Sequence, residues 1–285
     1  MTKLKIAIQK SGRLNDDSVK LLKDCGIDLK NGVNKLKTES DNFPMEIYFL
    51  RDDDIPQYVE DAVADIGIVG ENVVYEKNKN VEVIEHLGFG KCRLSIAVSR
   101  TENYGGVQYL NNKKIATTYP VIVQKLLDEN KINAEIHEIS GSVEIAPGIG
   151  LADAIVDLVS SGSTLFMNGL KEVETVLRSE AVLINNGNLS TEKKQILDKF
   201  LFRIRAVKKA KNNKYILLNA PNNKVAEIIS LLPGMKSPTV LPLAEPGWSS
   251  VHSVLNENEF WDIIEKLKDA GAQGILVIPI EKMIL

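Results

Sequence analysis

The chain has 285 residues, of which 44% are hydrophobic and 26% charged, values typical of a soluble protein with two or three domains. Its 35 basic residues are offset by 38 acidic ones, and the net charge of −3 argues against a duplex-DNA-binding protein, which would carry a basic face. No apolar run reaches the roughly 18 residues that a membrane helix needs. The first eight residues are predicted to form a strand and are too short for a signal peptide, so we expect a cytoplasmic protein.

The two cysteines, Cys25 and Cys92, are far apart, and the sequence contains no Cys-x-x-Cys pair. This usage indicates neither a metal cluster nor a disulfide framework. We interpret both residues as buried thiols rather than as nucleophiles.

The first 90 residues alternate between strand and helix patterns, which is typical of a parallel sheet, and a further strand follows at 92–98. Short apolar runs predict four strands, at residues 4–8, 45–50, 65–69 and 92–98. Asn15 is predicted to cap a first helix that Gly26 ends, and Asp54 to cap a second. The predicted buried residues are Val19, Leu22 and Cys25 in the first helix, and Ile55, Tyr58, Val59, Ala62 and Val63 in the second.

A second α/β unit follows. Strands are predicted at 114–118, 134–139, 154–159 and 181–184, and helices at 121–130, 170–177 and 191–209. The last of these helices is long, charged and amphipathic.

The C-terminal part has a different order of elements. Strands are predicted at 215–219, 239–243, 248–255 and 275–280. One helix follows a cap at Asn222 or Asn223 and ends at Pro233-Gly234, and a second, with Phe260 and Leu267 facing inward, ends at Gly271. The resulting βαββαβ order is the ferredoxin-like split unit. We expect the polar segment 208–214 to be the hinge before it.

The segment after the strand at 154–159 is rich in small residues: Ser160, Ser161, Gly162, Ser163 and Thr164. Small side chains let backbone N–H groups approach an anion, and the helix expected next would add a positive end. The segment is neither a Walker loop nor a Gly-x-Gly-x-x-Gly motif. By itself, such a segment is more often a serine-rich turn with a helix cap than a phosphate site.

Acidic residues near this segment strengthen the phosphate interpretation. Asp153 and Asp157 are four residues apart along the strand and should face the same side, and Glu144 lies upstream. Carboxylates would repel a phosphate unless they bind something else, such as the hydroxyls of a sugar or a magnesium ion. A ribose 5-phosphate that carries a magnesium pyrophosphate needs both kinds of site.

At this point the sequence resembles the ATP phosphoribosyltransferase family. The family signature is matched by Glu144, Gly150, Ala152, Ile155, Asp157, Leu158, Ser161, Gly162, Thr164 and Leu165. The resemblance extends over essentially the whole chain, through residues 11–14, 54–56, 65–70, 118–120 and 281–283. One departure is Glu71, where many family members have Asp.

The resemblance implies an α/β fold with a two-lobed core like that of periplasmic binding proteins and a C-terminal ferredoxin-like, ACT-like regulatory domain. Residues 1–93 and 180–206 would form one catalytic lobe, 94–179 the other, and 207–285 the histidine-binding domain. This is the long form of the enzyme, which needs no separate regulatory subunit and forms dimers and hexamers.

The implied reaction joins the phosphoribosyl group of phosphoribosyl pyrophosphate (PRPP) to N1 of ATP and releases pyrophosphate. It is the first step of L-histidine biosynthesis and is inhibited by histidine. Displacement at the sugar carbon needs no covalent protein nucleophile, so orientation and charge stabilisation would provide the catalysis. Mg²⁺ would arrive on the pyrophosphate, with no metal fixed by protein ligands.

The candidate site residues follow from these matches and from their places at strand ends. We expect catalytic roles for Arg13, Asp157 and Glu144. We expect the PRPP site to comprise Asp153, Asp157, Ser160, Ser161, Gly162, Ser163 and Thr164. We expect the ATP site to comprise Lys10, Arg13, Arg51, Glu71 and Tyr119. We expect regulatory histidine contacts at Thr239, Leu241, Ser249 and Ser250.

Several of these residues also have a purely structural interpretation. Arg13 could be a solvated loop arginine, Glu71 a helix-start residue, and Tyr119 a packing residue before a proline. Two rival functions remain open: a non-catalytic, two-lobed ligand-binding protein with a sensor domain, and a nucleotide-sensing regulator. The first would be supported by a signal peptide, and the second leaves the 160–164 segment and its carboxylates unexplained.

Overall fold

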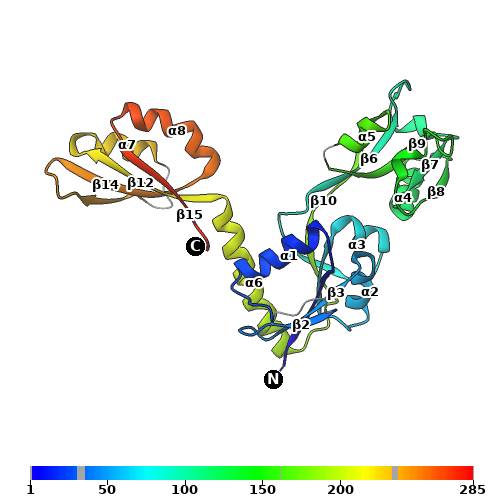
Figure 1. Cartoon of the computed structure of the whole chain (residues 1–285), viewed down its shortest axis with the longest axis horizontal. Coiled ribbons are helices and arrows are strands. Elements are labelled where there is room, and N and C mark those ends of the chain that lie inside the picture. Colours follow the sequence, from blue (N-terminus) through cyan, green and yellow to red (C-terminus); the bar gives the residue numbers. More distant parts are fainter. Residues whose placement is uncertain (1, 31–35, 161, 233–236, 285) are drawn as a thin grey trace. The chain divides into compact units, whose positions relative to one another are not determined.

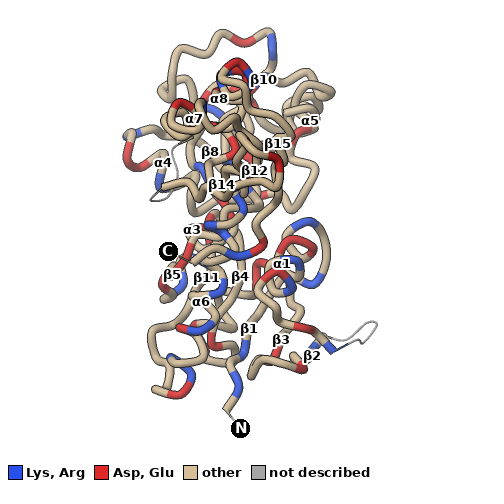
Figure 2. Tube along the Cα trace, turned by 90° about the vertical axis from the view of Figure 1, so that its left-hand side faces the viewer, with Lys and Arg blue, Asp and Glu red and all other residues tan. Residues whose placement is uncertain are grey.

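The computed structural model describes residues 2–30, 36–160, 162–232 and 237–284. The chain divides into two compact units, Met1–Asp198 and Lys199–Leu285. Lys and Arg are interspersed with Asp and Glu along the trace (Figure 2). None of the helices in the described ranges is long and apolar enough to cross a membrane.

The first unit begins with a sheet in the order β2-β3-β1-β4-β11-β5. Its strands are β1 (Leu4–Gln9), β2 (Lys37–Glu39), β3 (Met45–Leu50), β4 (Ile66–Gly70), β5 (Glu82–His86) and β11 (Ala181–Asn185). Its helices are α1 (Arg13–Asp24), α2 (Ile55–Glu60) and α3 (Glu71–Lys77), with a 3-10 turn at Asp52–Asp54. Because β3, β1 and β4 are parallel, their carboxyl ends share one edge of the sheet. We call this body the first lobe.

The same unit contains a second sheet, in the order β10-β6-β9-β7-β8. Its strands are β6 (Cys92–Ser99), β7 (Lys114–Thr117), β8 (Glu135–Glu138), β9 (Ala154–Val159) and β10 (Leu170–Ser179). Its helices are α4 (Pro120–Asn130) and α5 (Ser163–Met167), with 3-10 turns at Val107–Leu110 and Val143–Ile145. Strand β7 lies parallel to both β8 and β9, whereas β6 runs antiparallel to β9 and β10. We call this body the second lobe.

Helix α6 (Thr191–Lys211) connects to the second unit, which has the predicted βαββαβ order. Its elements are β12 (Asn213–Pro221), a 3-10 turn (Asn222–Lys224), α7 (Val225–Leu231), β13 (Thr239–Pro242), β14 (Trp248–Asn256), α8 (Glu257–Asp269) and β15 (Gln273–Pro279). The antiparallel sheet order β13-β14-β12-β15 is that of a ferredoxin-like domain. Helices α7 and α8 lie along one face of this sheet (Figure 1).

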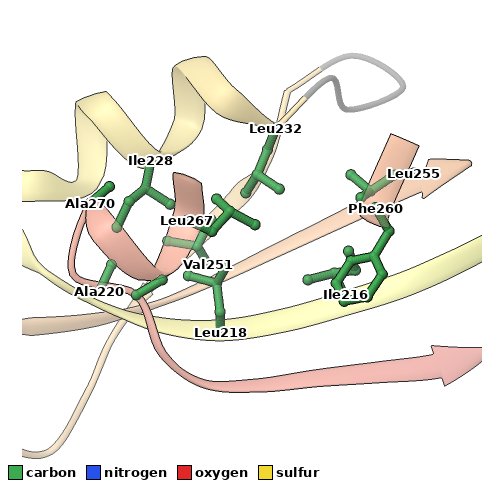
Figure 3. Packing of buried hydrophobic residues seen from close by; sticks show 11 residues of the cluster. Ile216, Leu218, Ala220, Ile228, Leu232, Val251, Leu255, Phe260, Leu267 and Ala270 are labelled. Atoms are coloured by element: carbon green, nitrogen blue, oxygen red, sulfur yellow. The ribbon is translucent and has the colours of Figure 1, made fainter. Parts of the chain in front are cut away.

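The core of the second unit lies between these two helices and the sheet. Ile228 of α7, Leu267 of α8 and Val251 of β14 point toward one another and are fully buried (Figure 3). Each such apolar side chain contributes about 1.5–3 kcal/mol when it is removed from water. The alternating burial of β12 follows from this arrangement, because only one face of the sheet is covered.

The predicted helix at 170–177 is wrong, since these residues form strand β10, paired with β6. The ladder shifts register twice, between Glu172 and Glu174 and between Thr175 and Leu177. Each shift is a bulge or irregularity that moves the following residues to the other face of the strand. Apolar residues three or four positions apart can then face the same core, which imitates a helical pattern.

Other predictions of local structure also need correction. Helix α1 begins at Arg13, after Gly12 with φ 88°, so Asn15 lies inside the helix and donates a hydrogen bond to the Gln9 carbonyl (2.5 Å). Helix α2 ends at Glu60, before Ala62 and Val63 of the predicted stripe.

Asp54 does occupy the N-cap position of α2, although its side chain makes no capping hydrogen bond. The expected hinge at 208–214 is helical to Lys211 and extended from Asn213. The residue before α7 is Lys224, not Asn222 or Asn223. Pro233-Gly234 lies outside the described residues.

Candidate active site

The segment predicted to bind phosphate lies at the carboxyl end of β9. Ser160 follows the strand, and Ser161 is outside the described residues. Gly162 precedes α5 with φ 78°, a left-handed conformation in which a side chain would be strained. Ser163 and Thr164, the first two residues of α5, are exposed. Since α5 has only five residues, hydroxyls and individual N–H groups would contribute more to anion binding than a helix dipole.

Asp157 lies near the end of the same strand, two residues before Val159. Its Oδ1 atom accepts hydrogen bonds from the Thr118 hydroxyl (3.0 Å) and from the Leu158 N–H (2.8 Å). Burial raises the pKa of Asp157 above its ordinary value, these two hydrogen bonds oppose the shift, and the negative charge of Glu144 adds to it. The structure thus brings Glu144 and Asp157 into electrostatic range of each other.

Asp153 lies at the other end of β9. One of its oxygens accepts a hydrogen bond from the Lys114 N–H (2.8 Å), and the other is 3.9 Å from the Lys113 ammonium. Strands rise by about 3.3 Å per residue, so Asp153 is roughly 20 Å from Ser160. The expectation that Asp153 and Asp157 act together at the segment is therefore not met by the geometry.

An arginine on the neighbouring strand contacts the start of the segment. Arg93 donates from Nη1 to the Ser160 carbonyl oxygen (3.1 Å) and makes two 2.5 Å bonds to the carboxylate of Glu172. The Ser95 hydroxyl also donates to Glu172 (2.8 Å). The hydrogen bond from Arg93 lowers the pKa of Glu172, which is consistent with a stable ion pair.

A second arginine contacts the end of α5. Arg100 donates from Nη2 to the Phe166 carbonyl oxygen (2.5 Å), and its guanidinium lies 3.6 Å from the centre of the Phe166 ring. Neither Arg93 nor Arg100 was identified from the sequence. The available signal was their placement around a buried strand: Arg93 lies near its start, and Arg100, seven positions later, directly follows its end.

The cationic candidates of the first lobe gather at one sheet edge. Lys10 follows β1, Arg13 begins α1, and Arg51 follows β3. All three side chains are exposed. Glu71, the first residue of α3, follows β4 at the same edge. This is the edge at which ligands bind in parallel α/β sheets.

Tyr119 lies where the two lobes meet. Its hydroxyl accepts a hydrogen bond from Asn72 Nδ2 (3.2 Å), and Asn72 in turn exchanges two hydrogen bonds with Ser179 (3.0 and 2.9 Å). Burial, followed by the charge of Asp157, raises the pKa of Tyr119, so it is a neutral phenol at physiological pH. Glu76, also on α3, accepts from the N–H groups of Val121 (3.0 Å) and Ile122 (3.1 Å) at the start of α4.

Sequence reasoning missed Asn72 and Glu76. They are spaced four apart on α3 and are 4% and 8% exposed. Two buried polar residues at i and i+4 on a helix were a usable signal for a shared contact surface.

A pocket of about 340 Å³ lies beside these contacts, where the chain passes between the lobes. Its lining includes Glu71, Lys91, Cys92, Arg178 and Ser179. Burial raises the pKa of the Cys92 thiol, so this cysteine is not an activated nucleophile. The lining carries charges of both signs.

The four regulatory candidates divide between the two faces of the C-terminal sheet. Residues paired across β13 and β14 share a face, so Leu241 lies beside Ser250, and Thr239 beside His252, on the face opposite α7 and α8. The hydroxyl of Ser250 is 3.0 Å from His252 Nε2. Ser249 instead faces the helices and donates to Asn222 Oδ1 (2.7 Å).

Within the described ranges, no group of three or more His, Cys, Asp and Glu side chains is arranged to hold a metal ion. Asp157 and Glu144 supply two carboxyl groups, and both residues are partly buried. Two such carboxylates fit sugar hydroxyls or the hydration shell of a cation that a ligand carries.

Comparisons with known proteins agree with this arrangement. A family model described as ATP phosphoribosyltransferase matches residues 51–206, and one described as "HisG, C-terminal domain" matches residues 210–282. An ATP phosphoribosyltransferase of Cytophaga hutchinsonii is 60% identical over 283 residues, which are 99% of each chain.

Two solved structures are similar to a large part of this chain. One is the ATP phosphoribosyl transferase (HisG:HisZ) complex from Thermotoga maritima, with a TM-score of 0.61 and 27% identity over 71% of this chain and 98% of the other. The second is a periplasmic sulfonate-binding protein of Methylobacillus flagellatus, with a TM-score of 0.51 and 12% identity over 72% of this chain and 67% of the other. The latter supports the fold alone and confirms the periplasmic-binding-protein-like architecture.

The signature residues Glu144, Asp157 and Thr164 lie within the matched range 51–206, and the matched relative extends over nearly all of both chains. The chain therefore belongs to the ATP phosphoribosyltransferase family.

Proposed function

We propose that this chain transfers the phosphoribosyl group of PRPP to N1 of ATP, giving 1-(5-phosphoribosyl)-ATP and pyrophosphate, as the first step of L-histidine biosynthesis. The N1–C1′ bond forms as the bond from C1′ to the pyrophosphate oxygen breaks, and the pyrophosphate leaves with the electron pair. The observation that carries the proposal is the placement of Asp157 beside the 160–164 segment, with Glu144 in electrostatic range. These residues belong to the family signature, and they form one anion-and-sugar site.

The second lobe, proposed to comprise residues 94–179, would bind PRPP. Backbone N–H groups and hydroxyls of residues 160–164 would hold the 5′-phosphate, because the exposed Ser163 and Thr164 begin α5. Asp157 would accept hydrogen bonds from the ribose hydroxyls. Because burial already penalises the charged form of Asp157, donors from the sugar would stabilise it. Asp153 is too distant to contribute to the same contact.

The first lobe, proposed to comprise residues 1–93 and 180–206, would bind ATP and the pyrophosphate. Lys10, Arg13 and Arg51 supply positive charge at the carboxyl edge of the sheet, where phosphate oxygens would lie. Arg13 would stabilise the charge that develops on the leaving pyrophosphate. Glu71 and Tyr119 would border the adenine, and the hydroxyl of Tyr119 is held by Asn72.

Mg²⁺ would reach this site on the pyrophosphate of PRPP, where it would neutralise negative charge. The residues present fit this mode of binding, since Asp157 and Glu144 offer two carboxylates rather than a complete coordination shell. Arg13 and Lys10 would then contact the oxygens that the ion leaves free.

The C-terminal domain, residues 207–285, would bind L-histidine as a feedback inhibitor. Thr239, Leu241 and Ser250 share the face of its sheet opposite α7 and α8, which we call the open face, although Ser250 itself is only 6% exposed. These three residues are the proposed contacts, whereas Ser249 faces the helices. The Thermotoga chain is matched over 98% of its own length and 71% of this chain, so the remainder of this chain has no counterpart there. Carrying its own regulatory domain, this chain would act without a separate regulatory subunit.

The open face of this sheet also supports self-association into dimers and hexamers. Its exposed apolar residues include Leu241, Leu276 and Ile278, which are 49%, 55% and 43% exposed. Apolar surface of this kind on a sheet is commonly covered by another copy of the chain. The enzyme would work in the cytoplasm, without nucleic-acid or membrane partners.

The test is a two-substrate assay of the purified full-length chain with Mg²⁺, ATP and PRPP. Formation of phosphoribosyl-ATP, identified by mass, with one pyrophosphate released per product molecule, is the expected result. Tight PRPP binding with no product would favour the rival function, a non-catalytic two-lobed binding protein.

A further inference from the structure

Glu76 connects the two lobes through its side-chain carboxylate. It belongs to α3 of the first lobe and is buried, with 8% of its surface exposed. One oxygen accepts from the Val121 N–H (3.0 Å) and the other from the Ile122 N–H (3.1 Å), both in α4 of the second lobe. Both oxygens of a first-lobe carboxylate are therefore bound to the second lobe.

These two N–H groups are the first that α4 offers. The helix begins at Pro120, which has no N–H, and its N-cap residue Tyr119 makes no side-chain capping bond. Glu76 thus supplies, from the other lobe, the cap that the local sequence of α4 does not provide. An anion at the start of an 11-residue helix also interacts favourably with the helix dipole.

The capped turn leads directly into the candidate active site. Tyr119, immediately before α4, is bound through its hydroxyl to Asn72, one helical turn before Glu76. Thr118, one residue earlier, donates to Asp157 (3.0 Å). Hydrogen bonds at Glu76 and Asp157, joined by the backbone of residues 118–122, therefore connect the first lobe to Asp157 of the second.

The backbone at Gly70 is fitted to this contact. A Cβ atom at Gly70 would lie 2.4 Å from Asn72 Oδ1, which is closer than real contacts allow. The absence of a side chain there lets Asn72 turn back toward Ser179 and present its Nδ2 group to Tyr119. The backbone at the start of α3 thus allows the side chains of Asn72 and Glu76 to contact the second lobe.

We propose that Glu76 is a positioning residue that fixes the separation of the two lobes, and through it the distance between the two substrates. The inference rests on the proposed function, in which the first lobe binds ATP and the second binds PRPP. Glu76 contacts neither substrate and acts through α4 and Tyr119. Two bound substrates react only when N1 and C1′ are held close and aligned, so loss of the connection lowers turnover more than binding.

The informative variant is Glu76→Gln in the full-length chain. The amide has the same shape, but its NH₂ group must face one of the two backbone N–H groups, so one acceptor is lost and two donors oppose each other. The matched control is Glu129→Gln, the same chemical change on the exposed side chain of α4. Glu76→Asp keeps the carboxylate but is one methylene shorter, and it tests whether the length of the side chain is required as well as its charge.

For Glu76→Gln we expect kcat to fall by about tenfold or more, with the KM values of ATP and PRPP within about threefold of wild type. Hydrogen exchange at the Val121 and Ile122 amides should accelerate, while the cores of both sheets keep wild-type protection. Glu129→Gln should match the wild type in both measurements, and Glu76→Asp should lie between the two.

Wild-type kcat in Glu76→Gln, while the wild type forms product, would overturn the inference and leave the proposed function intact. Accelerated exchange throughout the chain, with both KM values raised as much as kcat is lowered, would show a general structural role and would also overturn it. If the wild type forms no phosphoribosyl-ATP, the proposed function fails, and the positioning role fails with it.

Discussion

The guanidinium of Arg93 donates a hydrogen bond to the carbonyl oxygen of Ser160 (3.1 Å). This bond holds the start of the 160–164 segment against strand β6. Two bonds to Glu172, each 2.5 Å, fix the plane of the guanidinium. Because Glu172 neutralises Arg93, this contact orients the segment and adds little positive charge to it.

Replacing Arg93 with alanine should therefore weaken PRPP binding. The loss of one hydrogen bond to the segment, worth about 1 kcal/mol, predicts a roughly fivefold rise in the KM of PRPP with little change in that of ATP. Steady-state kinetics with each substrate varied in turn would measure this. Lys125→Ala, on the exposed side of α4, is the control, and equal effects of both variants would contradict the orienting role.

Thr164→Val should raise the KM of PRPP by about tenfold or more. The variant keeps the shape of the side chain and removes the hydroxyl, and a hydrogen bond to a charged phosphate is worth about 1.5–3 kcal/mol. Thr175→Val, at an exposed position of β10, is the matched control. Unchanged PRPP affinity in Thr164→Val, measured by calorimetry as well as kinetics, would remove Thr164 from the phosphate site.

Asp157→Asn should separate stability from activity. In the folded chain the pKa of Asp157 is raised above 3.8, so the protonated form is favoured by folding. The protonated carboxyl of Asp157 therefore contributes stability at low pH, and this contribution is lost as the pH rises through the folded-state pKa. Asparagine can accept the same two hydrogen bonds through Oδ1 but carries no charge.

The melting temperatures of wild type and Asp157→Asn should therefore be similar near pH 4. At pH 7 to 8 the melting temperature of the variant should be the higher of the two. The variant should be nearly inactive, because it offers the ribose a weaker acceptor. A wild type that gains stability relative to the variant as the pH rises would contradict the assigned direction of the pKa shift.

Histidine inhibition should depend on Ser250 and not on Ser249. Ser250→Ala, on the open face of the sheet, should raise the histidine concentration for half inhibition several-fold, which corresponds to about 1 kcal/mol. Ser249→Ala loses the bond to Asn222 and should lower the stability of the domain without changing the inhibition. The reverse pattern would place the histidine site on the helical face.

Most strand positions could be predicted because their apolar runs are short and bounded by polar residues. The prediction failed at residues 170–177, where register shifts in β10 imitate a helical period. That ambiguity is decided by pairing with β6, which lies more than 70 residues earlier in the chain. A local pattern carries no information about such a partner.

The candidate site shows the same division between local and long-range information. The position of Arg13 just after a strand could be predicted, since it follows from local chain order. Asp153 and Asp157 could be assigned to one face of a strand, but a shared strand face does not place two residues at the same strand end. Glu76 was missed because its partners, Val121 and Ile122, are backbone groups of another element.

The decisive measurement for the phosphate-binding role of residues 160–164 is a crystal structure of the full-length chain with PRPP and Mg²⁺. We expect the 5′-phosphate to bind backbone N–H groups and hydroxyls of residues 160–164, with the ribose hydroxyls against Asp157. PRPP bound in another part of the molecule, with residues 160–164 making no contact to it, would show that this segment is not the phosphate site.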